Sequence, residues 1–216
     1  MAAWWIFLRS KNSTITQRSS AESWLTIAAA CFPLFLQRGD VVVSSKRPAM
    51  KIHISIPHQT LELCDSTGNL LQCWAVSTAT RGAGELTGSY CTPRGAHVIR
   101  ARIGQGMPEN TVFVRRRPTG EVYSPELGAE YPDRDWILTR ILWLSGCEPG
   151  VNRLGNVDTM RRYIYIHGSP ESATMGIPGS HGCIRMRNAD IVALFDQVPV
   201  GTPVLIDAEE KGVDAA

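Results

Sequence analysis

Apolar and polar residues alternate along most of the chain from residue 50 onward. In residues 51–56 the alternation places Ile52, Ile54 and Ile56 on one face of an extended segment. Comparable short runs are separated by Gly, Pro, Asp and Asn residues, which favour turns. These runs occupy residues 61–64, 70–76, 96–101, 111–115, 136–144, 162–166 and 203–206. The pattern predicts a mainly β domain, with a hairpin around the turn residues at 65–69.

A helical period is clear in one segment near the C-terminal end, residues 189–198. Four apolar residues recur there on one helical face: Ile191, Leu194, Phe195 and Val198. Asn188 is predicted to be the N-cap, because its short side chain can accept hydrogen bonds from the first N–H groups of a helix. Pro199 ends the helix. We therefore expect one clear helix near the C-terminus.

Residues 1–49 differ in character from the rest of the chain. The longest uncharged apolar run, residues 24–36, has 13 residues and falls short of the ~20 that a spanning helix needs. Basic residues precede this run, as in a signal peptide, but a strand also begins abruptly after Met50. We therefore expect an N-terminal extension at residues 1–49 (a signal or anchor segment, or a misassigned start), a domain at residues 50–207 and a tail at residues 208–216. Membrane association is expected only if the extension forms an anchor.

The composition is that of an ordinary globular domain. Hydrophobic residues make up 44% of the chain, charged residues make up 19%, and the formal net charge is +2. This excess is too small to indicate a nucleic-acid partner, and no basic stripe alternates with aromatic residues. The densest basic run, Arg115-Arg116-Arg117, is followed by Pro118-Thr119-Gly120. We interpret it as a solvated strand end that leads into a turn.

Six cysteines are spread along the sequence without a C-x-x-C pair or the paired spacing of a metal site. Cys64 and Cys73 flank the predicted hairpin, so a cross-strand contact between them is within reach, although spacing alone predicts no disulfide. Five of the cysteines are interpreted as small buried apolar side chains: Cys31, Cys64, Cys73, Cys91 and Cys147. The sixth, Cys183, has a different setting.

The stretch from residue 163 to residue 187 concentrates the chemically capable side chains. A strand carries His167 to its end, directly before Gly168, and a loop rich in Gly, Ser and Pro follows. The loop closes with Ser180-His181-Gly182-Cys183 and continues into Arg185. Acyl transfer by a thiol needs a thiolate, a nearby imidazole and N–H donors for the oxyanion. Residues of all three kinds are present in this stretch.

The residue types indicate roles within this stretch. The thiol pKa, ordinarily about 8.5, is lowered by a neighbouring imidazole or arginine, and Arg185 is a candidate for the positive field. His167 comes from a separate segment and can meet the thiol head-on, so we favour it as the base and give His181 a supporting role. The N–H groups of Gly182 and Cys183 are candidates for the oxyanion site.

The pattern of His167-Gly168, eleven residues and then Ser180-His181-Gly182-Cys183-Ile184-Arg185-Met186 resembles the signature of L,D-transpeptidase catalytic domains of the YkuD type. The resemblance extends from about residue 50 to residue 206. It implies a β-sandwich-like domain with a mobile loop over the cleft. It also implies cleavage of the L,D-bond before the terminal D-alanine of a peptidoglycan tetrapeptide stem, a thioester on the cysteine, and transfer of the acyl group to an amine.

Carried onto this sequence, the resemblance implies Cys183 as nucleophile and His167 as acid/base, with the Gly168 carbonyl orienting the imidazole. Four neighbours would shape the pocket: Ser180, His181, Gly182 and Arg185. No metal or organic cofactor is implied. The expected partners are peptidoglycan stem peptides, with carbapenem-type β-lactams as inhibitors, and the expected location is the periplasm or cell envelope.

Two alternatives to this transferase are kept. The acyl acceptor is open, because crosslinking, exchange of the terminal D-amino acid, protein anchoring and hydrolysis would all use the same thioester; hydrolysis would make the protein an L,D-carboxypeptidase. The other alternative is a zinc-dependent hydrolase in which His167, His181 and Cys183 hold the metal and water takes the fourth position. No carboxylate stands at a spacing that would support these ligands.

Overall fold

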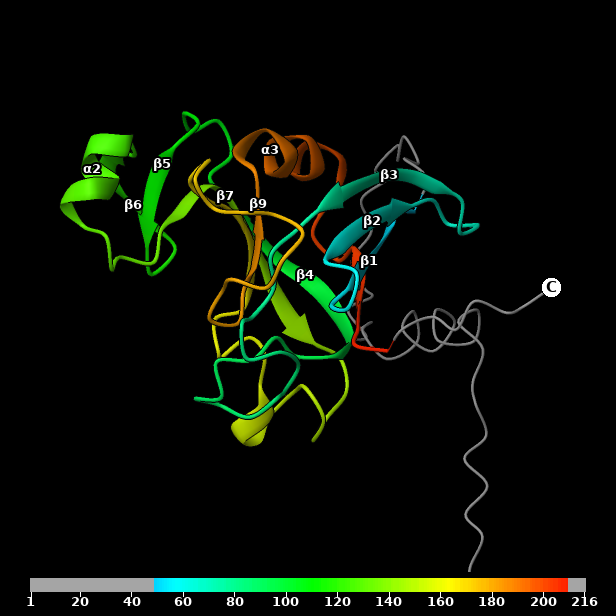
Figure 1. Ribbon diagram of the computed structural model, residues 1–216. Coiled ribbons are helices and arrows are strands. Elements are labelled where there is room, and N and C mark those ends of the chain that lie inside the picture. Colours follow the sequence, from blue (N-terminus) through cyan, green and yellow to red (C-terminus); the bar gives the residue numbers. More distant parts are fainter. Residues whose placement is uncertain (1–48, 210–216) are drawn as a thin grey trace, which may run out of the picture.

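The alternating runs of the sequence become the strands of one ten-stranded sheet in the computed structural model, which describes residues 49–209 (Figure 1). The strands are β1 (Lys51–Ser55), β2 (Thr60–Cys64), β3 (Leu70–Ala75), β4 (Gly95–Ile103), β5 (Thr111–Val114), β6 (Arg117–Val122), β7 (Ile137–Gly146), β8 (Tyr165–Gly168), β9 (Ile184–Met186) and β10 (Pro203–Asp207). Outside the sheet lie α2 (Pro125–Glu130), the 3-10 turn η1 (Gly155–Val157) and α3 (Asn188–Gln197). Most of the predicted N-terminal extension and of the predicted tail lie outside the described residues.

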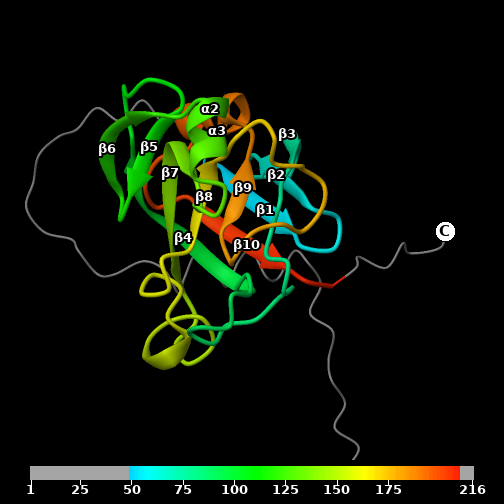
Figure 2. The same ribbon diagram turned by 60° about the vertical axis from the view of Figure 1, so that its left-hand side comes forward.

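The sheet branches at its longest strand, β7. Its main path runs β3-β2-β1-β10-β4-β7-β5-β6, and β8 pairs with β7 and then with β9. Leu138 of β7 pairs with both Val112 of β5 and Gly168 of β8, so β5 and β8 lie on opposite sides of β7. Most neighbours are antiparallel, but β1 pairs parallel to β10 and β8 pairs parallel to β9. Figure 2 shows β8 and β9 side by side next to β7.

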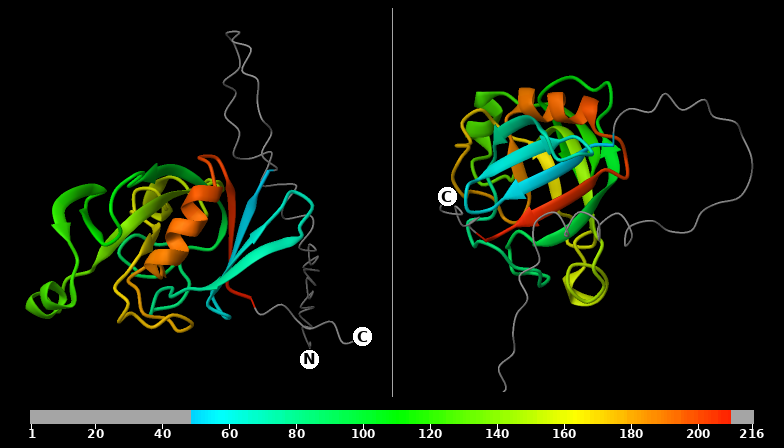
Figure 3. Two further views of the ribbon diagram at one scale, coloured as in Figure 1. Left: turned by 90° about the horizontal axis from the view of Figure 1, so that it is seen from above. Right: turned by 90° about the vertical axis from the view of Figure 1, so that its right-hand side faces the viewer.

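The sheet bends around one apolar core. In Figure 3 the layer of β1, β2 and β3 faces the layer that holds β8 and β9. The core draws Ile and Leu residues from both layers, and α3 adds Ile191, Leu194 and Phe195, all fully buried. Burying each such side chain stabilises the fold by roughly 1.5–3 kcal/mol. The prediction of a mainly β, sandwich-like domain with one clear helix near the C-terminus is confirmed.

The start of α3 differs from the prediction. The N-cap position belongs to Arg187, which makes no side-chain capping bond. Asn188 is inside the helix and buried, because its side chain is used elsewhere: it accepts a hydrogen bond from Thr139 Oγ1 at 2.6 Å and donates to Asn110 Oδ1 at 2.8 Å. The prediction of Asn188 as N-cap was therefore wrong, since tertiary partners outcompete the local capping bond.

The cysteines only partly follow the expectation of burial. Cys147 is 1% exposed and packs beside Ala96. Cys73 is exposed, and Cys64 is half-buried. In the hairpin register Cys64 pairs with Leu70, whereas Cys73 pairs with Glu62, so the two thiols are not cross-strand partners. The expectation was wrong for Cys73 because its strand, β3, is an edge of the sheet.

Cys91 is also half-buried, while Cys31 lies outside the described residues. Across residues 49–209, no helix has the length and apolarity that a membrane crossing requires.

Candidate active site

Two neighbouring strands bring the predicted site segments together. β8 ends at Gly168, β9 begins directly after Cys183, and His167 is the register partner of Arg185. Register partners, and residues two apart on one strand, project from the same face of a sheet. Tyr165, His167 and Arg185 therefore share one face, and Cys183 lies at the entrance of β9 beside them.

His167 is fixed in one orientation and has a free nitrogen. Its side chain is fully buried, and its Nδ1–H donates to the Gly168 carbonyl oxygen at 2.8 Å. Because a carbonyl only accepts, Nδ1 carries the proton and Nε2 carries the lone pair in the neutral ring. Nε2 is buried and has no hydrogen-bond partner. The arrangement agrees with the expectation that the Gly168 carbonyl orients the imidazole.

Close packing explains why glycine follows His167. A Cβ at Gly168 would clash with the Asn188 side-chain oxygen and would lie 2.8 Å from the Leu138 carbonyl oxygen. Any side chain here would push β8 away from β7 and displace the imidazole. Gly168 therefore has two functions: its small size allows the close packing of β8 on β7, and its carbonyl oxygen accepts the hydrogen bond from His167.

The Cys183 thiol is held by the backbone of the segment that leads into β8. Its Sγ accepts a hydrogen bond from the Tyr165 N–H at 3.4 Å, and its S–H donates to the Tyr163 carbonyl oxygen at 3.5 Å. No hydrogen bond joins Sγ to His167 Nε2, which has no partner within the described residues. The thiol and the imidazole are neighbours on one face, but they are not yet in contact.

Electrostatics keep both groups neutral, which contradicts the expected lowering of the thiol pKa. Burial, with a smaller contribution from the Asp135 carboxylate, raises the pKa of the Cys183 thiol to about 12, against the opposing effects of the Tyr165 N–H and of Arg185. Burial also lowers the pKa of His167 below its ordinary 6.5. Loss of water around both groups therefore outweighs the positive field of Arg185. Both shifts favour the neutral forms of the thiol and the imidazole.

The loop that carries the cysteine is closed by its own hydrogen bonds. Ser180 Oγ–H donates to the Cys183 carbonyl oxygen at 2.5 Å, and the Gly182 N–H donates to Ser180 Oγ at 3.2 Å. The Gly182 N–H is thus paired with Ser180 Oγ, and its role as an oxyanion donor stays a prediction. The Cys183 N–H donates no hydrogen bond within residues 49–209 and remains a candidate donor.

His181 and Arg185 lie on the rim of the site. His181 is exposed, and its ring meets Tyr90 edge-on with centroids 6.1 Å apart. Arg185 donates to the Gly179 carbonyl at 2.8 Å and forms a 2.5 Å ion pair with Asp135. His167, His181 and Cys183 do not converge, and no three His, Cys, Asp or Glu residues of the described part are placed to hold a metal ion. The geometry therefore gives no support to the zinc alternative.

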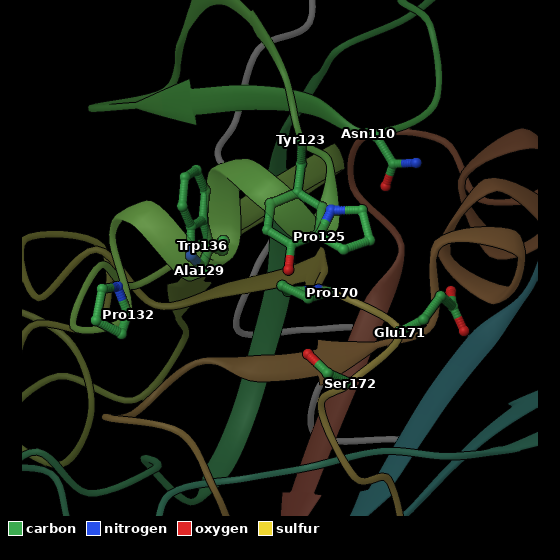
Figure 4. A pocket seen from close by; sticks show the side chains of 10 residues that line it. Asn110, Tyr123, Pro125, Ala129, Pro132, Trp136, Pro170, Glu171 and Ser172 are labelled. Atoms are coloured by element: carbon green, nitrogen blue, oxygen red, sulfur yellow. The ribbon is translucent and has the colours of Figure 1, made fainter.

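A groove of three adjoining hollows passes this rim. One hollow of about 660 Å³ and a second of about 500 Å³ share Asp135 and His181 in their walls. The second and a third, of about 430 Å³, share Pro132, Trp136 and Pro170. Figure 4 shows the third hollow, with the rings of Tyr123 and Trp136 on one side and Pro170 on the other. Arg185 lines the middle hollow.

Sequence reasoning missed two charged residues near the thiol. Asp135 lies in a Pro- and Asp-rich turn with no periodic signal, and only the fold places it on Arg185. Arg116 was interpreted as part of a solvated run, but it is half-buried and donates to the Tyr165 hydroxyl at 3.1 Å. Its exposed neighbours Arg115 and Arg117 fit that interpretation.

Comparison with known families agrees with this geometry. The model of the family described as the L,D-transpeptidase catalytic domain, YkuD, matches residues 49–206. This chain belongs to that family. Probable L,D-transpeptidase YbiS of Escherichia coli strain K12 is 32% identical over 125 residues, which are 53% of this chain and 40% of the relative. Probable L,D-transpeptidase ErfK/SrfK of Salmonella typhimurium strain LT2 is 53% identical over 127 residues, 54% of this chain and 40% of the relative.

The match to these two curated relatives thus spans less than half of their length. Among solved structures, L,D-transpeptidase 3 of Mycobacterium tuberculosis in complex with a faropenem-derived adduct is 17% identical, with a TM-score of 0.46. That alignment covers 75% of this chain and 61% of the other.

Proposed function

We propose that this chain is a peptidoglycan L,D-transpeptidase in which the Cys183 thiol attacks the carbonyl of the L,D-bond in a tetrapeptide stem. The observation that carries the proposal is the buried, unpartnered Nε2 of His167, on the strand that pairs with β9 directly after Cys183. A buried lone pair without a hydrogen-bond donor is costly. The S–H of Cys183 would satisfy the lone pair of Nε2 when the substrate is bound. The membership of the chain in the L,D-transpeptidase family supports the same chemistry.

The proposed first half-reaction forms a thioester. Rotation of the Cys183 side chain away from the Tyr163 carbonyl brings the S–H to His167 Nε2. As the carbon–sulfur bond forms, the thiol proton passes to Nε2 and the substrate carbonyl becomes an oxyanion, which the Cys183 N–H stabilises. The imidazolium then gives its proton to the amine of D-alanine as the carbon–nitrogen bond breaks.

The second half-reaction regenerates the enzyme. An acceptor amine attacks the thioester carbonyl, its proton passes to His167 Nε2, and the Cys183 sulfur leaves and takes that proton back. Water in place of the amine gives hydrolysis by the same steps. Neutral starting groups suit this cycle, because His167 must accept a proton before it donates one.

The test uses the full chain and a disaccharide tetrapeptide, with products analysed by mass. A crosslinked dimer or an exchanged stem supports transfer, and a tripeptide alone points to the carboxypeptidase. Cys183→Ala is expected to abolish every product, whereas Cys91→Ala removes another half-buried free thiol and is expected to keep them. Full activity in Cys183→Ala would rule out the proposed nucleophile.

The same thiol makes carbapenem-type β-lactams proposed inhibitors. Opening of the lactam ring by Cys183 adds the whole inhibitor mass to the protein. Intact-mass measurement is expected to show this addition in the wild type and in Cys91→Ala, and not in Cys183→Ala. We also propose the periplasm or cell envelope as the location and residues 50–207 as the catalytic domain, since the substrate is part of the cell wall.

A further inference from the structure

Arg116 is turned toward the site by the two-residue connection between β5 and β6. Arg115 and Arg116 both have positive φ, at 50° and 67°, as in the tight turns that suit the twist of a hairpin. Arg115 and Arg117 are exposed, whereas Arg116 is half-buried. The turn thus separates one arginine of the run from its two solvated neighbours.

Three aromatic side chains hold the Arg116 guanidinium. Its central carbon lies 4.2 Å from the Trp143 ring centroid and 5.0 Å from that of Tyr163. Its Nη1 donates to the Tyr165 hydroxyl at 3.1 Å. Cation–π contacts of this length orient a guanidinium and leave its edge open for hydrogen bonds.

Within residues 49–209 the guanidinium pairs with no anion, since none of the ion pairs formed there includes Arg116. In the same part of the chain one of its five N–H groups is used, by Tyr165. Two other arginines, whose charges act on the Cys183 thiol, already have acceptors: Arg185 pairs with Asp135, and Arg162 donates to loop carbonyls that include Cys91 at 2.6 Å.

Two of the aromatic residues that hold Arg116 also contact the Cys183 thiol. Tyr165 contacts Arg116 through its hydroxyl and Cys183 Sγ through its N–H. Tyr163 contacts Arg116 through its ring and the thiol through its carbonyl. The guanidinium and the sulfur are thus separated by the side chains of two residues. A ligand group on Arg116 therefore lies on the side of the thiol that Tyr163 and Tyr165 form.

We propose that Arg116 binds a carboxylate of the acyl-donor peptide beside the bond that is broken, through a bidentate contact in an orientation set by Trp143, Tyr163 and Tyr165. A planar fork of N–H donors matches a carboxylate, and partial burial strengthens the contact. The candidate groups are the carboxylate of the terminal D-alanine and, in a stem whose preceding residue carries one, the side-chain carboxylate of that residue. The identity of the ligand as acyl donor rests on the proposed function.

A purely structural role makes a different prediction. If Arg116 only fastened the hairpin to Trp143, its loss would weaken the binding of charged and uncharged peptides alike. A carboxylate receptor instead discriminates between an acid and its carboxamide. The test therefore measures a preference, which a general loosening of the site does not change.

Binding is measured by calorimetry in a Cys183→Ala background, so that no peptide is consumed. The probes are a tetrapeptide ending in D-alanine with both carboxylates free, and two analogues that each carry one carboxamide, on the terminal D-alanine or on the residue before it. The free acid is expected to bind roughly 10- to 100-fold more tightly than one analogue, the range for a hydrogen bond to a charged group. The weaker analogue identifies the carboxylate.

Arg116→Gln is expected to remove this preference, and Arg116→Lys to retain part of it through the charge alone. Arg117→Gln, on an exposed neighbour, is the matched control and is expected to keep it. An unchanged preference in Arg116→Gln, an equal loss for acid and amide, or no preference with Arg116 present would overturn the inference.

Turnover of the free-acid peptide by the full wild-type chain is followed in parallel. If the preference depends on Arg116 but no turnover occurs, the carboxylate site stands and the proposed function fails. If turnover occurs without an Arg116-dependent preference, the function stands and this inference fails.

Discussion

The Asp135 carboxylate and the Arg185 guanidinium form a 2.5 Å ion pair at the edge of the groove. Asp135 lines two of the three hollows, and Arg185 is the register partner of His167. The negative charge of Asp135 raises the pKa of both His167 and Cys183. One side chain on the groove wall therefore influences both members of the proposed catalytic pair.

Removing this charge is expected to make the thiol more acidic. In Asp135→Asn the thiolate of Cys183 loses a nearby negative charge, so its pKa falls from about 12, and the pKa of His167 falls as well. The pH dependence of Cys183 alkylation by iodoacetamide, followed by mass, reports the first shift. Asp133→Asn, in the wall of the same hollow, is the control and is expected to leave the profile in place. An unchanged profile in Asp135→Asn would refute the argument.

The acid limb of kcat/KM is expected below pH 6.5. His167 must be neutral to accept the thiol proton, and burial lowers its pKa, so protonation disables it only at lower pH than for an ordinary histidine. The thiol has a pKa of about 12, so no ionisation step is expected near the ordinary thiol value of about 8.5. Rates measured on the tetrapeptide from pH 4 to pH 10 test both statements. An acid limb above 6.5 would contradict the neutral pair.

Stability is expected to fall as the pH drops from 6.5 toward 4, because of His97. Burial lowers the pKa of this fully buried residue to about 4. Between these values the unfolded chain binds more protons than the folded one, so the free energy of unfolding decreases as the pH falls, by up to about 3 kcal/mol. Urea unfolding at pH 7 and pH 4.5 measures the change.

His97→Asn is expected to reduce this dependence and leave the part that comes from the buried His167, whereas His58→Asn, on an exposed histidine, is expected to preserve it. For each variant, the free energy of unfolding at pH 4.5 is subtracted from that at pH 7. This difference cancels any destabilisation that does not depend on pH, such as the loss of the His97 contact with Thr159. Equal slopes in the wild type and in His97→Asn would exclude His97 as the source.

Asn188→Ala is expected to destabilise the fold by about 1–3 kcal/mol, because it leaves buried groups without partners. Asn188 joins Thr139 on β7 to Asn110 before β5. Asn156→Ala removes an exposed amide and serves as the reference in chemical unfolding. A loss in Asn188→Ala no larger than in Asn156→Ala would show that the buried bonds contribute little.

Most strands could be predicted because each has a local period of two. Ile52 and Ile54 alternate with polar residues and are fully buried, as expected. The strand β6 and the helix α2 were missed for the opposite reason. β6 is largely exposed and contains Pro118 and Gly120, and α2 has six residues and buries none of them. Elements without a buried face leave no apolar period to detect.

The two segments of the proposed site could be predicted from the sequence, whereas their electrostatics could not. The spacing of His167 and Cys183 indicated acyl transfer, and the parallel pairing of β8 with β9 brings the two segments together. The direction of the thiol pKa depends on burial and on Asp135, and neither is encoded in the motif. The N–H of Gly182 was assigned from residue type alone, which gives no information about the competing Ser180 hydroxyl.

The hairpin of β5 and β6, together with α2, is attached to the remaining sheet by only two register pairs, Val112 with Leu138 and Phe113 with Ile137. It carries a small apolar cluster of its own, in which Tyr123 and Leu127 pack on Trp136. Replacement of α2, which buries none of its residues, would leave the central packing intact and yet reshape one wall of the groove. We therefore expect relatives that accept different peptides to differ most between residues 125 and 130.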